Sequence, residues 1–244
     1  MEKLTKEYIL NCLDKYCHFS NELCDGTVVA DIIKPLQNAE CFPKGEWIWD
    51  AGVSKVVLIF SNLPFVIKIP FIGEEIEVDV WDEENECYAD EMDYEFYPFT
   101  LEQAPNNVCD RYAFDHWDYC DIEADRYLLA TDHNLKECFA KTELLGFAQN
   151  HPIYIQERAI MFNQSEESKH SDEEYTKASN LRKEHGFYIN IHWVMDFIFY
   201  YGEKMFKALA DFCEKYDIED LHDGNIGYIG GRPCLVDYSS YYGV

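Results

Sequence analysis

The sequence predicts an α+β protein with two parts, a strand-rich N-terminal part and a helical C-terminal part. Three features support this prediction. Short apolar runs rich in Val, Ile and Phe, separated by turn residues, occupy residues 46–71. Apolar side chains at helical spacing fill residues 191–216, and a polar loop at 220–225 precedes a short apolar strand at 234–236. Because strands and helices are segregated along the chain, they indicate an antiparallel sheet together with a group of helices.

The first expected elements are a helix and a three-stranded sheet. Residues 3–17 carry apolar side chains at roughly helical spacing, which predicts a short amphipathic helix. Three strands with polar turn residues between them are expected at 46–49, 55–60 and 65–71. This pattern is typical of an antiparallel meander.

Residues 72–117 differ in composition from the rest of the chain. They contain fifteen Asp and Glu residues and one basic residue, Arg111. Aromatic and apolar residues lie between the acids, among them Val78, Trp81 and Tyr94, and indicate partial structure. We interpret the segment as an acidic insertion, either a solvated surface or a docking surface for a basic protein.

The chain then returns to regular patterns. A helix is expected at 118–132, and a second pair of strands at 141–147 and 152–156. Polar residues 163–185 are expected to form a loop with some helix. The wide apolar arc of residues 191–216 predicts one long helix that is buried on more than one side.

The composition limits the partners and the compartment. The formal net charge of −27 repels nucleic acid and anionic lipid, so neither is expected as a partner. None of the ten cysteines forms a Cys-x-x-Cys pair, which favours reduced, buried thiols over a zinc site. The N-terminus is too charged for a secretory signal, and the apolar runs are too short to span a bilayer. We therefore expect a cytoplasmic protein.

The most informative residues for function lie near the C-terminus. Asp220 and Asn225 are five positions apart in a polar loop, and Asp237 follows the apolar strand. Phosphoryl transfer requires a carboxylate that orients the attacking hydroxyl, together with an amide and a carboxylate that hold Mg²⁺. These three residues match that requirement, although Asp, Asn and Gly also favour ordinary turns.

The order of these elements, together with the loop, resembles the protein-kinase-like superfamily, and most closely its aminoglycoside- and choline-phosphotransferase-like branch. That branch commonly reads His-Gly-Asp-Leu-His-Pro-Gly-Asn, and this chain reads Ile218-Glu-Asp-Leu-His-Asp-Gly-Asn225. The resemblance implies a two-lobed fold with an N-terminal lobe at 1–158 and a minimal helical lobe at 159–244. It also implies an ATP- and Mg²⁺-dependent phosphotransferase, with Asp220 as the catalytic residue and Asn225 and Asp237 as metal ligands.

The same resemblance assigns nucleotide-binding residues. Lys68 matches the strand lysine that contacts the α- and β-phosphates, and Glu123 is its expected carboxylate partner, with Asp121 and Asp125 as alternatives. The remaining positions are implied for the phosphate-covering loop and the adenine-binding segment: Gly52, Ser54, Lys55, Glu157 and Ala159.

Several features depart from the family pattern. Only Gly52 remains of the usual loop glycines, and Ile218 and Glu219 replace residues that normally brace the catalytic loop. The sequence after Asp237 is seven residues long, so we expect the activation segment and the late helices that carry peptide substrates to be absent. A homodimer is one arrangement that would cover the helix exposed in such a short lobe.

Three functional interpretations follow. The first is an active phosphotransferase that uses Mg-ATP, with a small molecule or a protein as the hydroxyl acceptor. The second is a kinase-like pseudoenzyme that binds a nucleotide or a protein partner. The third is an acidic inhibitor or decoy that engages basic proteins.

Overall fold

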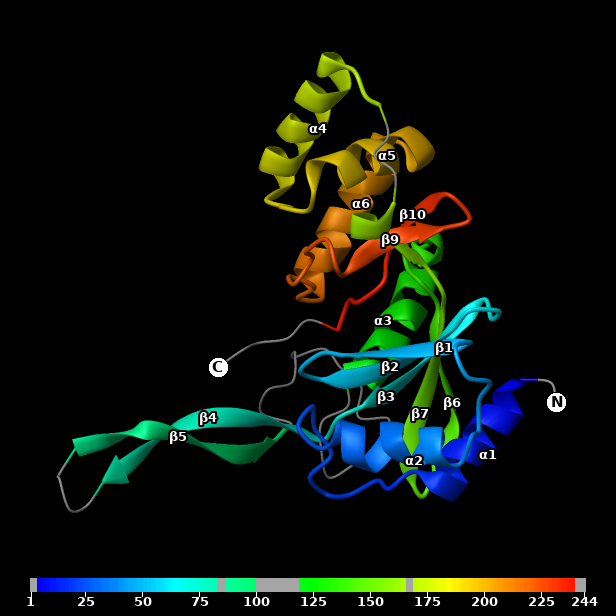
Figure 1. The fold of residues 1–244 in the computed structure, drawn as a ribbon. Coiled ribbons are helices and arrows are strands. Elements are labelled where there is room, and N and C mark those ends of the chain that lie inside the picture. The colour runs from blue at the N-terminus through cyan, green and yellow to red at the C-terminus, as the bar shows by residue number, and fades with distance from the viewer. Residues whose placement is uncertain (1–3, 83–86, 100–118, 166–168, 240–244) are drawn as a thin grey trace. The chain divides into compact units, whose positions relative to one another are not determined.

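The computed structural model describes residues 4–82, 87–99, 119–165 and 169–239 (Figure 1). Over these residues the chain is an α+β protein with antiparallel sheets and six α-helices, as the sequence predicts. The chain divides into two compact units, each with its own internal contacts. Among the described residues, the first unit comprises 4–82, 87–99, 119 and 144–154, and the second comprises 120–143, 155–165 and 169–239. Residues 120–143, which the sequence-based division placed in the N-terminal lobe, group with the second unit.

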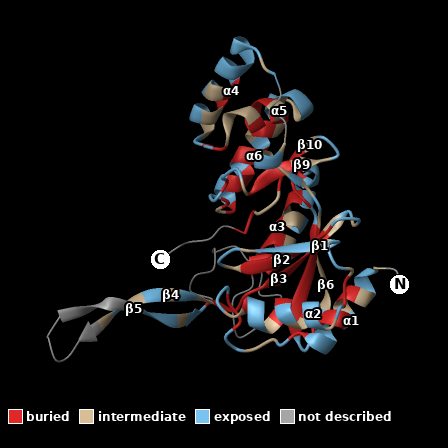
Figure 2. Ribbon diagram, in the orientation of Figure 1, coloured by how far each residue is buried: buried red, intermediate tan, exposed pale blue. Residues whose placement is uncertain are grey.

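A five-stranded sheet of order β1-β2-β3-β7-β6 contributes most of its residues to the first unit, whereas residues 142–143 of β6 and 155–157 of β7 belong to the second. Its strands are β1 (Trp47–Ala51), β2 (Lys55–Phe60), β3 (Phe65–Pro70), β6 (Thr142–Ala148) and β7 (His151–Glu157). Strands β1, β2 and β3 pair antiparallel in sequence order, so the predicted meander is confirmed. The predicted second strand pair is confirmed as β6 and β7. Figure 2 shows β2, β3 and β7 as mostly buried, whereas the edge strand β1 is largely exposed.

Short helices complete the first unit: α1 (Lys6–Tyr16), a π-helical turn (Val29–Ile33) and α2 (Lys34–Asn38). Helix α1 confirms the predicted N-terminal helix, and the Thr5 side chain caps it by accepting from the Tyr8 N–H at 3.1 Å. The β6–β7 turn is fixed to this helix, because the Gln149 N–H donates to Asp14 Oδ1 at 2.8 Å. His151 is buried, and its Nε2 lies 2.9 Å from the Pro70 carbonyl oxygen.

The acidic insertion contains a two-stranded hairpin, β4 (Gly73–Asp82) and β5 (Cys87–Pro98). The sequence indicated only partial structure in this segment; the rest of it, 100–117, lies outside the described residues. The hairpin pairs carboxylates with aromatic or apolar residues across the strands, as in Glu77 opposite Tyr94. Figure 2 shows the described side chains as exposed or intermediate along most of its length.

The second unit contains the other helices and a three-stranded sheet of order β10-β9-β8. Its elements are α3 (Tyr119–Asp132), whose first residue belongs to the first unit, two 3₁₀ turns (Lys136–Cys138 and Phe162–Gln164), β8 (Ile160–Met161), α4 (Asp172–His185), α5 (Ile191–Tyr201), α6 (Glu203–Lys215), β9 (Ile226–Ile229) and β10 (Arg232–Leu235). Its core is rich in aromatic residues and includes fully buried Trp193, Phe197 and Phe206. No helix in the described ranges is long and apolar enough to cross a membrane.

One sequence-based expectation is wrong in this unit, and a second is made more definite. The single helix expected at 191–216 is two helices, because Gly202 adopts φ 86° and ψ 163° between α5 and α6. Each helix buries its own apolar face, which explains the wide apolar arc in the sequence. The polar segment 163–185, expected to be a loop with some helix, contains the fourteen-residue helix α4, and a capping box between Ser171 and Glu174 forms the N-terminus of this helix.

The break at Gly202 predicts a stability effect. Its φ and ψ lie in a region that is essentially restricted to glycine, where another residue costs about 1–3 kcal/mol. We therefore expect Gly202→Ala to lower the free energy of unfolding by roughly this amount in urea denaturation. Gly52→Ala is the control, since that glycine lies in open space without a left-handed φ. Equal stabilities of the two variants would contradict the strain argument.

Candidate functional site

Asp220, Asn225 and Asp237 are joined by a small hydrogen-bond network in the second unit. The Asn225 side chain donates from Nδ2 to the Asp220 carbonyl oxygen at 2.7 Å and contacts Asp220 Oδ2 at 3.3 Å. The Asn225 carbonyl oxygen accepts from the N–H groups of Val236 and Asp237, at 2.8 and 3.2 Å. Asn225 therefore contacts both Asp220 and the backbone of Asp237.

The local sequence explains why Asn225 and Asp237 lie close together although they are twelve positions apart. Strands β9 and β10 form a short hairpin in which Ile226 pairs with Leu235. Gly230 and Gly231 supply its turn with φ values of 59° and 85°, a conformation that favours glycine at both positions. The residues just outside the last pair, Asn225 and Val236, are consequently adjacent.

The 218–225 loop is closed by its own residues. The Asn225 N–H donates to the His222 carbonyl oxygen at 2.8 Å, and the Gly224 N–H donates to His222 Nδ1 at 2.9 Å. A Cβ atom at Gly224 would lie 2.7 Å from the His222 ring, so this turn favours glycine. His222 therefore acts within the loop as a structural acceptor.

Asp220, Asn225 and Asp237 differ in how far their side chains are exposed to solvent. The Asp220 side chain is 48% exposed, whereas Asn225 is buried and Asp237 is intermediate. An exposed carboxylate can meet an acceptor molecule from solvent. The buried amide instead fixes the loop, and Ser239 Oγ donates to Asp237 Oδ1 at 3.1 Å.

Asn225 and Asp237 fit a magnesium ion whose other coordinating oxygens come from bound phosphate groups and water. Because Asn225 Nδ2 faces Asp220, the amide atom that can serve as a metal ligand is Oδ1. Mg²⁺ prefers such oxygen ligands, and it usually takes one or two protein groups with phosphates and water. The described residues contain no group of three or more His, Cys, Asp or Glu side chains that could hold a metal alone. Asn225 and Asp237 would therefore hold Mg²⁺ only together with a nucleotide.

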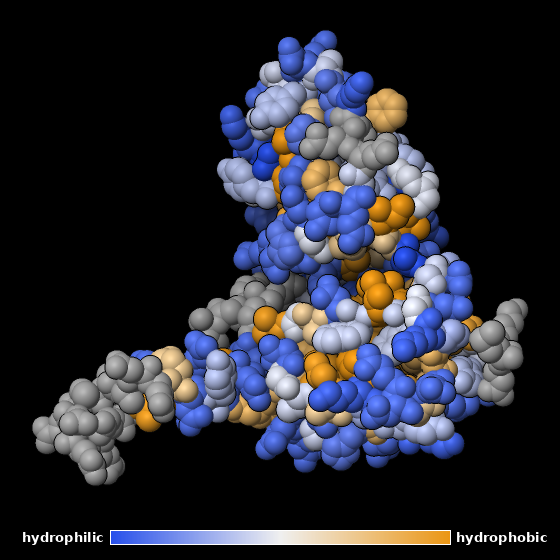
Figure 3. Space-filling view, viewed as in Figure 1, coloured by the Kyte–Doolittle hydropathy of each residue, from blue (hydrophilic) through white to orange (hydrophobic). Residues whose placement is uncertain are grey.

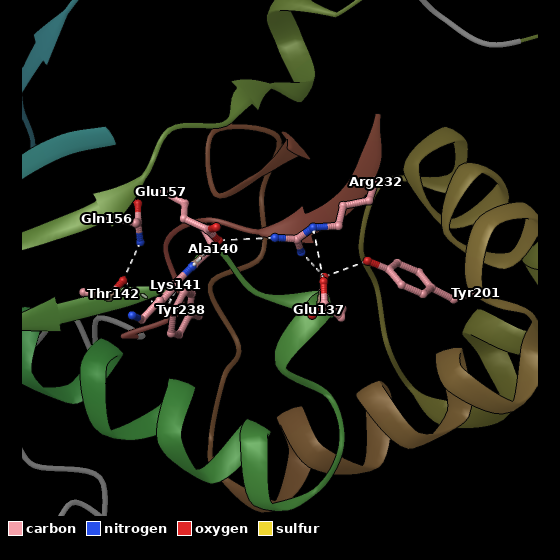
Figure 4. A network of polar contacts seen from close by, with 9 residues as sticks. All are labelled: Glu137, Ala140, Lys141, Thr142, Gln156, Glu157, Tyr201, Arg232 and Tyr238. Atoms are coloured by element: carbon pink, nitrogen blue, oxygen red, sulfur yellow. Dashed lines mark hydrogen bonds and ion pairs between the residues drawn. The ribbon is translucent and has the colours of Figure 1, made fainter. Parts of the chain in front are cut away.

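Glu123 lies in α3 and belongs to a buried polar network (Figure 4 shows its other members). Its Oε2 accepts from Thr142 Oγ1 at 3.2 Å and from Gln156 Nε2 at 3.1 Å. Glu123 is fully buried, and the alternative residues Asp121 and Asp125 are also buried. Within the second unit, Glu123 thus has a defined role as an acceptor beside Gln156; its pairing with Lys68 stays a prediction.

The predicted phosphate-binding residues of the first unit lie close together in its sheet. Across β2 and β3, Lys55 pairs with Pro70, and Val57 pairs with Lys68. The two lysines are therefore diagonal neighbours on one face of the sheet, and the backbone positions of such neighbours are roughly 7–8 Å apart. Both lysines are buried. Gly52 and Ser54 lie in the β1–β2 turn, where the Gly52 N–H donates to the Lys55 carbonyl oxygen at 3.1 Å.

The two residues predicted to border adenine have different environments. The Glu157 N–H donates to the Lys141 carbonyl oxygen at 3.0 Å, and its Oε2 lies 3.2 Å from an Arg232 NH2 group. Figure 4 shows these contacts beside Tyr201, which donates to the Glu137 carbonyl oxygen at 2.6 Å. Glu157 therefore stabilises the second unit, whereas Ala159 lies in the connection between β7 and β8.

The sequence assigned no role to Arg126 or Tyr238, and it placed Gln156 only at the start of the segment expected to border adenine. In the structure, Gln156 and Arg126 donate to the backbone carbonyl groups on either side of Asp237. Arg126 is buried and donates to the carbonyl oxygens of Tyr238 and Tyr216, at 2.5 and 2.6 Å. The sequence did contain an indication of this role, because Arg126 occupies an apolar position of the helix predicted at 118–132. A buried arginine at such a position needs several hydrogen-bond acceptors.

No known protein family, curated protein or solved structure matches this chain. The functional assignment therefore depends on the residues of the site itself.

The thiol nearest this site is not suited to act as a nucleophile. Burial raises the pKa of Cys234 to about 12, although Arg232 opposes part of that shift. At pH 8 only about one molecule in 10,000 would carry the thiolate, which is the reactive form.

We therefore expect iodoacetamide at pH 8 to leave Cys234 unmodified in the native protein and to modify it fully in denaturant. Peptide mass spectrometry measures both states. Cys138, whose pKa burial also raises to about 12, should behave in the same way. Rapid native labelling of Cys234 would contradict its burial.

Proposed function

We propose that this protein is a kinase-like phosphotransferase that moves the γ-phosphate of Mg-ATP to a hydroxyl group. The observation that carries the proposal is the double connection made by Asn225, through its amide to Asp220 and through its carbonyl to the Asp237 segment. The carbonyl contact continues the β9–β10 hairpin, and the amide contact adds a link to Asp220 that a hairpin does not require. A phosphotransferase needs such a link, because its catalytic carboxylate and metal ligands must be held in one fixed arrangement.

Asp220 has the catalytic role in this proposal. Its exposed carboxylate accepts a hydrogen bond from the acceptor hydroxyl and receives the proton as the oxygen attacks the γ-phosphorus. The new bond joins the acceptor oxygen to phosphorus, and the bond to the β–γ bridging oxygen breaks. The contact between Asp220 Oδ2 and the Asn225 amide, 3.3 Å, limits the orientations that this carboxylate can adopt.

The remaining assignments complete the nucleotide site. Mg²⁺, held by Asn225 and Asp237 when bound with ATP, would neutralise negative charge on the phosphates. Lys68 and Lys55 are assigned to the phosphates, together with the Gly52–Ser54 turn. Backbone groups around Ala159 are assigned to adenine. The acceptor is a small alcohol or a protein hydroxyl.

Two substitutions separate catalysis from metal binding. We expect Asp220→Asn to lower turnover at least 100-fold while nucleotide binding persists, because only the proton acceptor is removed. We expect Asp237→Ala to abolish the Mg²⁺-dependent part of ATP binding. Asp223→Asn is the control: Asp223 is exposed in the same loop and accepts from the Asn190 amide at 2.9 Å.

Thermal unfolding with Mg-ATP measures binding, and ADP formation with choline, an aminoglycoside and a basic protein as acceptors measures turnover. Ligand at 100 times its dissociation constant should add about 2.7 kcal/mol of stability to the native protein. No stabilisation of the wild type at millimolar Mg-ATP would refute the proposal. Metal-dependent binding without ADP formation by any acceptor would favour the pseudoenzyme.

A second candidate function is binding of a basic protein through the β4–β5 hairpin. No basic residue occurs between Ile72 and Phe99, and Glu75, Glu77 and Asp79 are exposed on one face of β4. On the same face, β5 presents Phe96, Tyr94 and Met92 directly opposite these acids. Figure 3 shows hydrophilic residues with more hydrophobic ones between them along this hairpin.

Such a surface suits Arg and Lys side chains. Tyr94 is 59% exposed and donates to Glu77 Oε1 at 2.8 Å, so an incoming guanidinium can contact the ring and the carboxylate together. Both strands also have unpaired edges in the described residues, and an extended peptide could pair with such an edge.

Neutralising the acidic face should weaken this binding. We expect the triple variant Glu75→Gln, Glu77→Gln, Asp79→Asn to bind an Arg-rich peptide at least tenfold more weakly at 50 mM salt, as measured by fluorescence anisotropy. The control triple Glu184→Gln, Asp211→Asn, Glu214→Gln changes the net charge equally at exposed positions of α4 and α6. Equal losses for both triples would show attraction by net charge alone and would exclude a specific hairpin surface.

A further inference from the structure

Three consecutive residues around Asp237 are held through their backbone groups. The Val236 carbonyl oxygen accepts from Gln156 Nε2 at 2.7 Å. The Asp237 N–H donates to the Asn225 carbonyl oxygen, and the Tyr238 carbonyl oxygen accepts from Arg126. The carbonyl groups on both sides of Asp237 are thus held by buried side chains, Gln156 at 1% and Arg126 at 3% exposure.

Arg126 connects this segment to the Asp220 loop. One guanidinium NH2 group donates to the carbonyl oxygens of Tyr216 and Asp217, at 2.6 and 3.3 Å, and the other donates to the Tyr238 carbonyl oxygen. Tyr216 and Asp217 directly follow α6 and precede the 218–225 loop. A planar, permanently charged group with several fixed donors can hold both backbone segments at once, and a lysine cannot reproduce this geometry.

Gln156 is oriented by its buried neighbours. Its Nε2 contacts Glu123 Oε2, Thr142 Oγ1 and the Val236 carbonyl oxygen, whereas its Oε1 is buried without a partner among the described residues. Turning the amide around would place an oxygen against two acceptors, Glu123 and Val236. Glu123 therefore forces the donor side of Gln156 towards the backbone that carries Asp237.

Tyr238 closes the network from the other side. Its hydroxyl donates to the Ala140 carbonyl oxygen at 2.7 Å and lies 3.0 Å from Thr142 Oγ1, as Figure 4 shows. Burial raises its pKa well above the ordinary value, so the hydroxyl stays a donor. Tyr238, the residue after Asp237, is thus fixed through its backbone carbonyl and through its side chain.

We propose that Arg126 and Gln156 are positioning residues that hold the Asp237 carboxylate relative to Asp220. The inference rests on the proposed phosphotransferase function, because it assigns the network to the metal-binding residue of that site. Residues that hydrogen-bond to metal ligands, without contacting the metal themselves, typically lower the metal affinity 10- to 100-fold when they are substituted.

The test uses the full chain with Gln156→Met, Arg126→Lys and the control Tyr201→Phe. Methionine matches the length of glutamine without its donor. Tyr201→Phe also removes a hydrogen bond to a carbonyl oxygen, but this oxygen belongs to Glu137 in the 3₁₀ turn Lys136–Cys138 and not to residues 236–238. Two measurements are made: hydrogen exchange at the amides of residues 236–238 without nucleotide, and the Mg²⁺ concentration that half-saturates stabilisation by ATP.

We expect Gln156→Met and Arg126→Lys to speed exchange at Asp237 and to raise the half-saturating Mg²⁺ concentration at least tenfold. Tyr201→Phe should change neither quantity. If Arg126→Lys does not fold, Gln156→Met alone decides the question, since its side-chain volume is conserved.

The failures of the two proposals are distinguishable. A wild type that Mg-ATP stabilises, together with a Gln156→Met variant of unchanged Mg²⁺ dependence, would overturn the positioning role and leave the phosphotransferase intact. A wild type that Mg-ATP does not stabilise would overturn the phosphotransferase and, with it, the positioning role, whatever the exchange rates.

Discussion

The buried guanidinium of Arg126 is the contact on which the functional part of the second unit depends. It joins the end of α6 to the residue after Asp237, two backbone segments that are separated by more than twenty positions in the sequence. A buried positive charge is unfavourable unless acceptors surround it. The carbonyl oxygens of Tyr216, Asp217 and Tyr238 provide those acceptors, so the same requirement that satisfies the arginine also fixes the two loops.

Hydrogen bonds inside this unit form two layers around Asp237. Asn225 is the inner layer, because it contacts both Asp220 and the Asp237 backbone. Gln156 and Arg126 form the outer layer and hold the neighbouring carbonyl groups. These hydrogen bonds act together with the buried core residues Leu221, Ile226 and Leu235, which flank the proposed catalytic residues in the sequence.

The sequence predicted elements whose signal is local. The meander at 46–71 and the strands β6 and β7 were recognisable from alternation and turn residues. Asp220, Asn225 and Asp237 lie close together because only one loop and one hairpin separate them along the chain, and their functional roles stay predictions. The division at Gly202 was missed because apolar residues continue through it, and a glycine's φ value is not visible in a hydropathy pattern. The backbone contacts of Arg126 and Gln156 were missed because those partners lie 80 or more positions away, at Tyr216, Val236 and Tyr238.

The β4–β5 hairpin leaves the sheet unit and returns to it at nearly the same point. The Phe99 N–H donates to the Ile72 carbonyl oxygen at 2.9 Å, and the Ile72 N–H donates to the Leu23 carbonyl oxygen at 3.1 Å. Residues 74–80 and 92–98, whose burial the structure describes, are all exposed or intermediate, so the sequence at these positions is only weakly constrained by folding. The hairpin can thus diverge, or be exchanged for another ribbon, without repacking the five-stranded sheet. Recognition could evolve in this segment independently of the residues around Asp220.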